Sequence, residues 1–277
     1  MKLKNIGIVC VHFEPKKLSR TLLALQRIER SALALHSVFV ANHEDAVSAL
    51  NSAGAKPGES SEVLLHDNSG MEFGGYQAGL DQLLRAVSPE WVLFANDTFA
   101  THHNFEAVSR QKLVGELKRT VDFPMVIGQV KSLPRSYELA GLRTHRWITT
   151  NLFALNRPAL RALGNRVYWP EIESLVTETS EIDKFFALSV DNVLRDHLRT
   201  WLFCDRADWH WYASEPLQPA NAAKMARKAR SILQEKYLAA LLDSSGAAFA
   251  DLNELSFTGK VWREAERGFS ALINRNP

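Results

Sequence analysis

Short apolar runs alternate with stretches of helical periodicity along the first half of the chain. The runs at residues 6–13, 37–42, 63–66, 91–95 and 125–130 have the length and composition of buried strands. Between them, residues 18–35, 45–53, 77–87 and 105–120 have the spacing and composition of helices. Strands that alternate with helices predict an α/β fold with a parallel or mixed sheet flanked by helices on both faces.

The alternation is less regular after residue 130. A strand is predicted at residues 148–155, a helix that opens at Pro158, an amphipathic helix at 182–199, a strand at 201–204 and a long helix at 222–242. We therefore predict one α/β domain over residues 1–215, followed by a helical C-terminal segment over residues 216–277.

Composition narrows the class of protein only slightly. The chain is 46% hydrophobic and 23% charged, as is ordinary for a globular protein, and its net charge of +2 predicts no nucleic-acid partner. Cys10 and Cys204 lack metal-site spacing, so free thiols in a reducing compartment are expected. The first apolar run is too short for a signal peptide, and no run is long enough to cross a membrane, so a cytoplasmic location is expected.

Polar side chains replace apolar ones where two predicted strands end. Asp67 and Asn68 follow one strand, and Asn96 and Asp97 follow the next. In open α/β sheets, ligands lie beyond the carboxyl ends of strands, where a carboxylate can accept hydrogen bonds from a nucleoside or hold a divalent cation against phosphates. The alternative is that each segment is only a local turn or a helix N-cap.

Two adjacent glycines, Gly74 and Gly75, lie between these strand ends and before the predicted helix that begins at Gln77. Glycines allow a close approach of backbone to a ligand, and a helix N-terminus favours anionic groups. The segment matches neither of the glycine-rich phosphate-binding motifs, and plain turn glycines are the alternative.

The segments DNSG, FGGYQAGL and WVLFANDTF together resemble the nucleotide-sugar half of GT-A glycosyltransferases. The nearest resemblance is to family 2 and to the rhamnan-synthesis type of polysaccharide glycosyltransferase, and it covers about the first 160 residues. It implies a Rossmann-like mixed sheet flanked by helices. Residues 1–130 would form the nucleotide-sugar half and residues 131–215 the acceptor half.

The resemblance also implies roles for single residues. The implied nucleotide-sugar contacts are Glu14, Asp67, Asn68, Gly74, Gly75, Gln77, Asn96 and Asp97. Asp97 would stand at the DxD-like position and bind a divalent metal, Mn²⁺ or Mg²⁺, that bridges the diphosphate. The sequence departs from the family there, because it offers one carboxylate where the DxD motif offers two. Metal binding could therefore be weaker, could depend on water and phosphates, or could be absent.

An inverting transfer needs a general base that takes the proton of the acceptor hydroxyl. By resemblance, that base is an acid near the start of a helix in the second half, and Asp183, Glu181 and Asp191 are equal candidates. Acids of this kind also occur simply as favourable first-turn residues or on a solvated face.

Other polar and aromatic groups could contact substrate. Thr149, Thr150 and Asn151 could contact an acceptor sugar, Trp209, Trp211 and Tyr212 could stack on sugars or pack against a helix, and His102 and His103 could contact a metal or diphosphate. Lys224, Arg227, Lys228 and Arg230 make the start of the last long helix basic, which suits an anionic membrane surface or simply a solvated face.

The sequence therefore predicts a glycosyltransferase that uses a nucleotide-sugar donor and a glycan or lipid-linked acceptor. Its expected setting is the assembly of bacterial surface polysaccharide, such as lipopolysaccharide, O-antigen or capsule, with peripheral contact to the inner membrane. A non-catalytic glycan-binding or assembly subunit on the same fold is the alternative. A nucleotidyltransferase ranks last, because the first strand runs into His12, Phe13, Glu14 and Pro15 without a glycine-rich loop.

Overall fold

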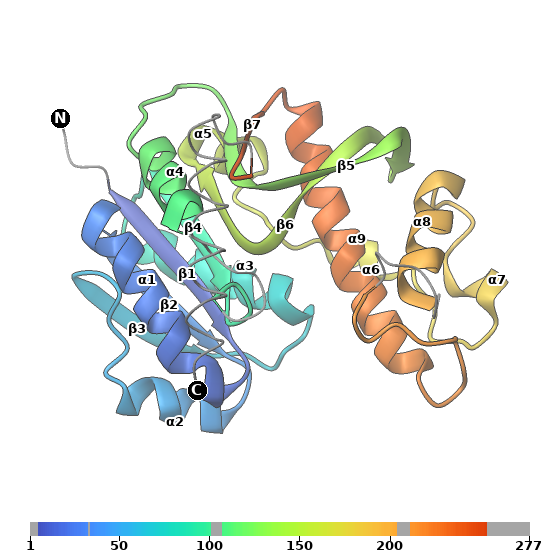
Figure 1. Cartoon of the computed structure of the whole chain (residues 1–277), viewed down its shortest axis with the longest axis horizontal. Coiled ribbons are helices and arrows are strands. Elements are labelled where there is room, and N and C mark those ends of the chain that lie inside the picture. The colour runs from blue at the N-terminus through green and yellow to red at the C-terminus, as the bar shows by residue number, and fades with distance from the viewer. Residues whose placement is uncertain (1–4, 33, 101–106, 204–210, 254–277) are drawn as a thin grey trace, which may run out of the picture.

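The computed structural model describes residues 5–32, 34–100, 107–203 and 211–253. Within these residues, seven strands form one sheet in the order β3-β2-β1-β4-β6-β5-β7 (Figure 1). The strands are β1 (Ile6–His12), β2 (Ala34–Ala41), β3 (Ser60–Leu65), β4 (Trp91–Asn96), β5 (Met125–Leu139), β6 (Leu142–Asn156) and β7 (Ala248–Asp251). β3, β2, β1 and β4 are parallel to one another, whereas β6 is antiparallel to both β4 and β5. The predicted α/β class with a mixed sheet is confirmed.

Helices cover both faces of this sheet. They are η1 (Pro15–Lys17), α1 (Leu18–Ala32), α2 (Glu44–Ser52), α3 (Met71–Ala86), α4 (Ala107–Leu117), α5 (Arg157–Ala162), α6 (Pro170–Glu173), α7 (Ile182–Phe185), α8 (Asn192–Phe203) and α9 (Ala222–Ser244). Alternate strand residues face opposite cores, as the strand period of two requires. Ile8 and Cys10 of β1 belong to the core shared with α1 and α4, and Val9 and Val11 to the core shared with α3 and α9.

Helix α3 begins at Met71 and not at Gln77, so the glycine pair lies inside the helix. Gly70, with φ 68°, supplies the left-handed residue at which the helix starts. A Cβ on Gly75 would lie 2.9 Å from Val11, and one on Gly79 would lie 2.5 Å from Val9. The glycines therefore let α3 lie close against β1 and β2, where a side chain would be in the way.

The second half of the chain departs further from the predicted elements. The helix predicted at residues 182–199 is divided into α7 and α8, and the intervening Phe186 pairs with Val176 in an isolated β-bridge. A new helix then starts because the side chain of Asp191 accepts hydrogen bonds from the amides of Val193 and Leu194. The prediction of a strand at residues 201–204 is wrong for residues 201–203, because α8 continues through them to Phe203.

Helix α9 and strand β7 lie within the segment predicted as a helical extension. Leu233, Leu238 and Leu242 of α9 are fully buried in the core beneath the sheet, and β7 adds a parallel strand beside β5. The described part of residues 216–277 is therefore built into the same fold and is not set apart from it. Cys10 is buried as a free thiol, while Cys204 lies outside the described residues.

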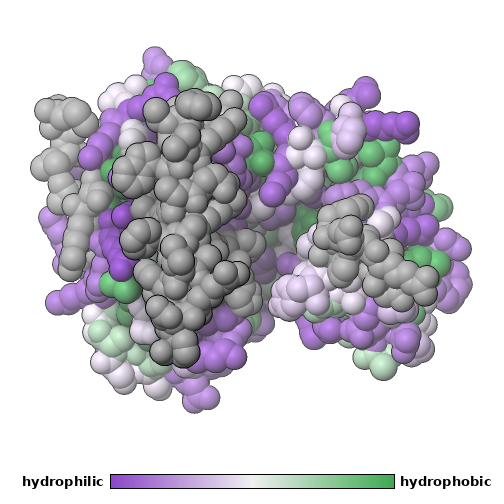
Figure 2. All heavy atoms as spheres, in the orientation of Figure 1, coloured by the Kyte–Doolittle hydropathy of each residue, from purple (hydrophilic) through white to green (hydrophobic). Residues whose placement is uncertain are grey.

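The surface of the molecule is mostly polar on the face drawn in Figure 2, where small apolar areas are scattered among hydrophilic side chains. Among the described helices, none combines the length and the apolar character that a membrane crossing requires.

Candidate functional site

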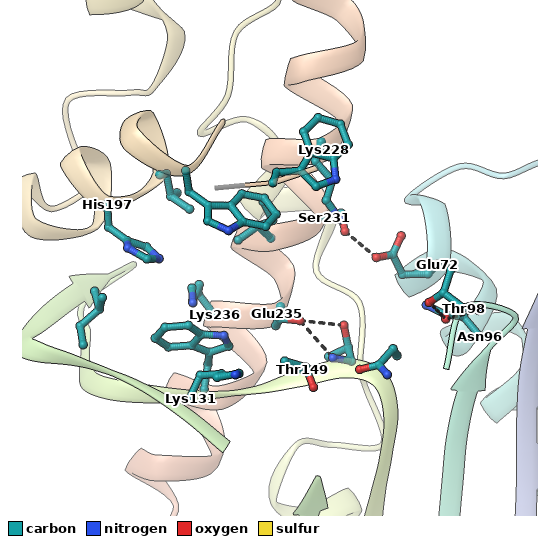
Figure 3. A pocket seen from close by; sticks show the side chains of 18 of the residues that line it. Glu72, Asn96, Thr98, Lys131, Thr149, His197, Lys228, Ser231, Glu235 and Lys236 are labelled. Carbon is teal, nitrogen blue, oxygen red and sulfur yellow. Dashed lines mark hydrogen bonds between the residues drawn. The ribbon is translucent and has the colours of Figure 1, made fainter. Parts of the chain in front are cut away.

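A cavity of about 860 Å³ opens between the carboxyl end of β4 and helices α8 and α9 (Figure 3). Its lining comes from α3, β4, β5, β6, α8 and α9, and from the segment before α9. This volume is in the range of cavities that bind small molecules. The cavity also lies at the carboxyl end of a parallel strand, where ligands of open α/β sheets are found.

The wall next to β4 is formed by Asn96, Thr98 and Glu72. The side-chain oxygen of Asn96 accepts hydrogen bonds from the amide of Thr98 at 3.0 Å and from its hydroxyl at 2.5 Å. The Glu72 carboxylate accepts a hydrogen bond of 2.6 Å from the hydroxyl of Ser231, which joins α3 to α9 across the cavity. This wall is thus polar and held in place by local hydrogen bonds.

The floor of the cavity centres on Glu235 of α9. Its Oε2 atom accepts hydrogen bonds from the amide of Thr150 at 3.0 Å and from the hydroxyl of the same residue at 3.1 Å. Burial raises the pKa of Glu235 above its ordinary value, and the charges of Lys236 and Lys228 offset this effect only in part. The group is therefore an oriented carboxyl whose proton affinity is increased, as is typical of a general acid or base.

Lys236 and His197 lie at the end of the cavity away from β4 (Figure 3), and Trp147 lies beside both of them. The Nζ atom of Lys236 lies 2.6 Å from the centroid of the Trp147 ring, and the His197 ring lies 5.8 Å from the same ring. Burial lowers the pKa of Lys236 well below its ordinary value. Burial, followed by the charge of Lys236, lowers the pKa of His197 to about 4, so this imidazole is neutral at pH 7.

Three more aromatic side chains line the outer part of the cavity. The rings of Trp201 and Trp211 are stacked with their centroids 6.1 Å apart, and Tyr212 meets Trp211 edge to face. The Nζ atom of Lys228 lies 5.9 Å from the centroid of Trp211. Of the predicted aromatic cluster, Trp211 and Tyr212 therefore reach the cavity, while Trp209 lies outside the described residues. His102 and His103, predicted as metal or diphosphate contacts, also lie outside them.

Asp97 is buried behind the wall that Asn96 and Thr98 form. Its Oδ2 atom accepts hydrogen bonds from the amide of Phe13 at 2.9 Å and from the amide of Glu14 at 2.7 Å, so it ties the end of β4 to the end of β1. The same oxygen lies 3.8 Å from Nδ1 of His12, whose pKa is lowered by burial. The position suits a structural acceptor.

This geometry does not fit the metal site that the family resemblance implied. Asp97 is 2% exposed and is absent from the described residues that line the cavity. Among the described residues, no group of three or more histidine, cysteine, aspartate or glutamate side chains could hold a metal ion. No step of the chemistry below is therefore derived through a metal at Asp97.

The other predicted nucleotide contacts lie at the expected edge of the sheet but outside the lining of the cavity. Glu14 follows β1, where ion pairs with Lys16 and Lys17 lower its pKa to about 2. Asp67 follows β3, and its exposed carboxylate accepts hydrogen bonds from Ser69 that lower its pKa. Asn68 has φ 65° and accepts a 3.3 Å hydrogen bond from Asn42 after β2. The ends of β1, β2, β3 and β4 thus form one polar edge.

Gly74, Gly75 and Gln77 serve packing in the structure. A Cβ on Gly74 would lie 1.8 Å from the carbonyl oxygen of Ser69, so only glycine fits there. The Gln77 side chain accepts a hydrogen bond of 2.8 Å from the amide of Val167 and donates one of 2.8 Å to Asp81. These three residues position α3, and none of them lines the cavity within the described part of the chain.

The three predicted catalytic acids also lie away from the cavity lining that the structure describes. Asp183 is exposed and forms a 3.2 Å ion pair with Arg199, and Glu181 is exposed and pairs with Lys184 at 2.6 Å. Asp191 caps α8 with its side chain. Each arrangement corresponds to the alternative that the sequence left open, namely a solvated acid or a helix-start acid.

Glu72, Ser231, Glu235 and Lys236 are site residues that the sequence analysis missed. Lys236 carried a usable signal, since it falls four residues after Ile232 and four before Ala240, on the apolar stripe of α9. A charged residue in the middle of an apolar stripe is buried with a partner or faces a cavity.

The fold and the cavity together define an α/β protein whose ligand site lies between a strand end and a helical wall. No protein-family model matches the chain, and no curated protein sequence is significantly similar to it. Among solved structures, the chain is similar to the 2-C-methyl-D-erythritol 4-phosphate cytidylyltransferase from Thermus thermophilus. The identity is 15% and the TM-score 0.28, over 79% of this chain and 98% of that one. So low a likeness carries no information on activity or substrate.

Proposed function

We propose that the chain is a glycosyltransferase that moves a sugar from a nucleotide-diphosphate donor to a glycan or lipid-linked acceptor. The observation that supports this proposal is the two-sided cavity, with Asn96 and Thr98 on one wall and Glu235 and Lys236 on the other. A transferase must hold two substrates side by side, and this cavity joins a strand-end site to a wall rich in aromatic and charged groups. The family resemblance of the segment around residues 67–98 supports the nucleotide sugar as donor.

The donor nucleotide belongs over the polar edge formed by the ends of β1 to β4, with its sugar towards Asn96 and Thr98. The roles of Glu14, Asp67 and Asn68 as nucleotide contacts stay predictions. The acceptor then lies against β6, α8 and α9. Transfer in bacterial surface polysaccharide assembly, and contact of the basic start of α9 with the inner membrane, also stay predictions.

Glu235 is the residue that we propose as the general base, in place of Asp183, Glu181 and Asp191. It lines the cavity, and the two hydrogen bonds from Thr150 fix Oε2 and leave Oε1 directed away from that contact. The raised pKa brings the carboxyl closer to working pH, where removal of a hydroxyl proton is more efficient. In the reaction, Glu235 would accept the proton of the acceptor hydroxyl while that oxygen attacks the anomeric carbon and the nucleoside diphosphate leaves.

The first test is a screen of UDP-, GDP-, dTDP- and CMP-sugars by thermal unfolding, with and without Mn²⁺, followed by an assay of nucleotide release with glycan acceptors. A donor at a concentration of about 100 times its Kd stabilises the folded protein by about 2.7 kcal/mol, which is readily measured. If no nucleotide sugar raises the unfolding temperature and none is consumed, the proposal is overturned.

The second test compares Glu235→Gln with Glu171→Gln. Glu171 is an exposed acid on α6 and is not among the described residues that line the cavity, so it is a matched control. Glu235→Gln should lower the transfer rate by about 10²–10⁴-fold and leave stabilisation by the donor unchanged, because loss of a general base affects proton transfer and not donor binding. Equal rates for the two variants would remove Glu235 from the mechanism.

A non-catalytic glycan-binding or assembly subunit is the second candidate, and the position of Asp97 favours it. The carboxylate that the family would use for the donor diphosphate is instead bound to the amides of Phe13 and Glu14. Glycan binding without consumption of any donor in the screen would support this candidate against the transferase.

A further inference from the structure

Most of the basic side chains that line the cavity lie far from Glu72. Glu72 lies at the β4 end, whereas Lys131, Lys236 and His197 lie at the opposite end, contributed by β5, α9 and α8 (Figure 3). Lys228 of α9 also lines the cavity. The end away from β4 is therefore a recess lined by nitrogen-bearing side chains, next to Glu235, within a site that the proposed function assigns to the acceptor.

The two carboxyl groups of the cavity accept hydrogen bonds from hydroxyl and amide groups, whereas its lysines lack carboxylate partners. Glu72 accepts a hydrogen bond from Ser231, and Glu235 accepts two from Thr150. In the part of the chain that the structure describes, no ion pair with a carboxylate and no hydrogen bond is found for the Nζ atoms of Lys131, Lys228 and Lys236. The recess thus has donors that a bound ligand could use.

Lys236 is the member of this group that a structural role explains least well. It is 1% exposed, its Nζ atom lies 2.6 Å from the centroid of the Trp147 ring, and the carboxyl group whose charge acts on it is Glu235. Burial of an amine costs desolvation energy. A ligand in the cavity that supplies a hydrogen-bond acceptor would offset this cost.

We propose that this recess binds the anionic group of an acidic acceptor sugar, a carboxylate or a phosphate, with Lys236 as its main anchor. Lys131 and Lys228, which also line the cavity, add positive charge to it. The indole rings of Trp201 and Trp211 provide apolar faces for the carbon skeleton of the sugar. The assignment of the sugar as the acceptor depends on the proposed function, whereas the binding of an acidic sugar does not.

Protonation gives the recess a way to distinguish acidic from neutral sugars. Burial lowers the pKa of Lys236 well below its ordinary value, and the groups that face its amine are Glu235, Trp147 and His197. A bound anion would stabilise the ammonium form, so binding should be accompanied by proton uptake. A neutral sugar offers no such stabilisation.

The test measures binding without any donor nucleotide, by calorimetry and ligand-observed NMR. The probes are D-glucuronate, D-glucose 6-phosphate, D-glucose and inorganic phosphate at constant ionic strength. One of the two acidic sugars should bind at least about tenfold more tightly than glucose, as expected for one charge-assisted hydrogen bond. Which of the two it is identifies carboxylate or phosphate as the natural group.

Lys236→Met should reduce this preference to about twofold or less, a loss of at least about 1 kcal/mol of selectivity by the tenfold-per-1.4 kcal/mol relation. Arg227→Gln is the control, because it removes a charge from the exposed face of the same helix without changing a described residue of the lining. Lys131→Gln is a second variant, exposed and therefore tolerated by the fold, and should weaken the preference by a smaller factor.

Equal affinity for glucuronate, glucose 6-phosphate and glucose would overturn the proposal, as would an unchanged preference in Lys236→Met. Binding of inorganic phosphate as tightly as either acidic sugar would overturn the assignment to a sugar. Calorimetry in buffers of different ionisation enthalpy adds a readout that a structural lysine would not give, namely proton uptake that is lost in Lys236→Met. Selective binding of an acidic sugar without consumption of any donor would contradict the proposed transferase and would still support this binding site.

Discussion

The carboxylate of Asp97 should contribute strongly to stability, and its removal measures whether it is a structural group. It is 2% exposed, and one of its oxygens accepts the amides of both Phe13 and Glu14. A hydrogen bond to a charged acceptor contributes about 1.5–3 kcal/mol. Because water can reach the half-buried amides that remain, the two bonds together should be counted near the lower end, at about 3 kcal/mol.

Asp97→Ala should therefore lower the free energy of unfolding by about 3 kcal/mol, or the melting temperature by about 6–12 °C for a chain of this size. Asp97→Asn keeps one oxygen acceptor and should cost about 1 kcal/mol. Asp122→Ala, at an exposed aspartate, should stay within about 0.5 kcal/mol of the wild type. Urea unfolding followed by circular dichroism measures all three.

Repeating the unfolding measurements with Mn²⁺ distinguishes a structural role of Asp97 from a metal-binding role. If the carboxylate is structural, Mn²⁺ should shift the unfolding midpoints of the wild type and Asp97→Asn by the same amount, including zero. The reasoning is refuted if Asp97→Ala unfolds like the wild type, or if Mn²⁺ stabilises the wild type and has no effect on Asp97→Asn.

Three further substitutions test the packing of the site, each by urea unfolding. Gly74→Ala should cost about 3 kcal/mol of stability, because its Cβ would lie 1.8 Å from a backbone carbonyl oxygen. Gly115→Ala in α4 is the control and should gain about 0.5–1 kcal/mol, because no atom lies within 4 Å of its Cβ. Equal effects of the two substitutions would contradict the close contact of α3. Tyr76→Phe should cost about 1 kcal/mol, since the buried hydroxyl donates a 2.7 Å hydrogen bond to a carbonyl of β6, and a neutral result would contradict it. Lys236→Met should gain about 1–3 kcal/mol by removing the desolvation cost of a buried amine. The pKa of Lys236 is lower in the folded protein than in the unfolded chain, so the unfolded chain holds a proton that the folded wild type releases. The stability of the wild type therefore rises with pH, and the gain of Lys236→Met should shrink towards pH 10.5. A destabilised variant, or a gain that grows with pH, would contradict this reasoning.

The first half of the fold could be predicted because each of its strands is an uninterrupted apolar run. All seven residues of β1 are buried, and β4 is buried from Trp91 to Ala95, so the sequence signal is strong. The long hairpin of β5 and β6 is exposed along much of its length, and its polar positions conceal the strands between residues 131 and 147. Only the end of helix α8 is concealed, because its last turn around Trp201 has the apolar composition of a short strand.

The site could be predicted only in part, for a reason that depends on sequence separation. The polar strand ends at Asn96 and Asp97 are visible because each interrupts a local apolar run. The different roles of these two residues cannot be predicted from the sequence. The two amides that bind the Asp97 side chain and hold it inside the protein lie more than 80 residues away along the chain. The partners of Glu235 and Lys236, namely Thr150 and Trp147, are equally remote in sequence.

Two segments near the cavity carry energetic costs, and these costs have different physical origins. After β3, Asn68 and Met71 adopt positive φ values of 65° and 53°, which costs backbone energy at residues that are not glycine. On α9, Glu235 and Lys236 cost desolvation energy instead. The turn after β3 fixes the start of α3, and Glu72 at that start accepts a hydrogen bond from Ser231 on α9. This one hydrogen bond joins the two costly segments across the cavity. A fold that needed only a stable core would carry neither cost. Glu235 and Lys236 both line the cavity, so their cost is the strongest physical reason to place the chemistry there and not at the exposed acids near α7.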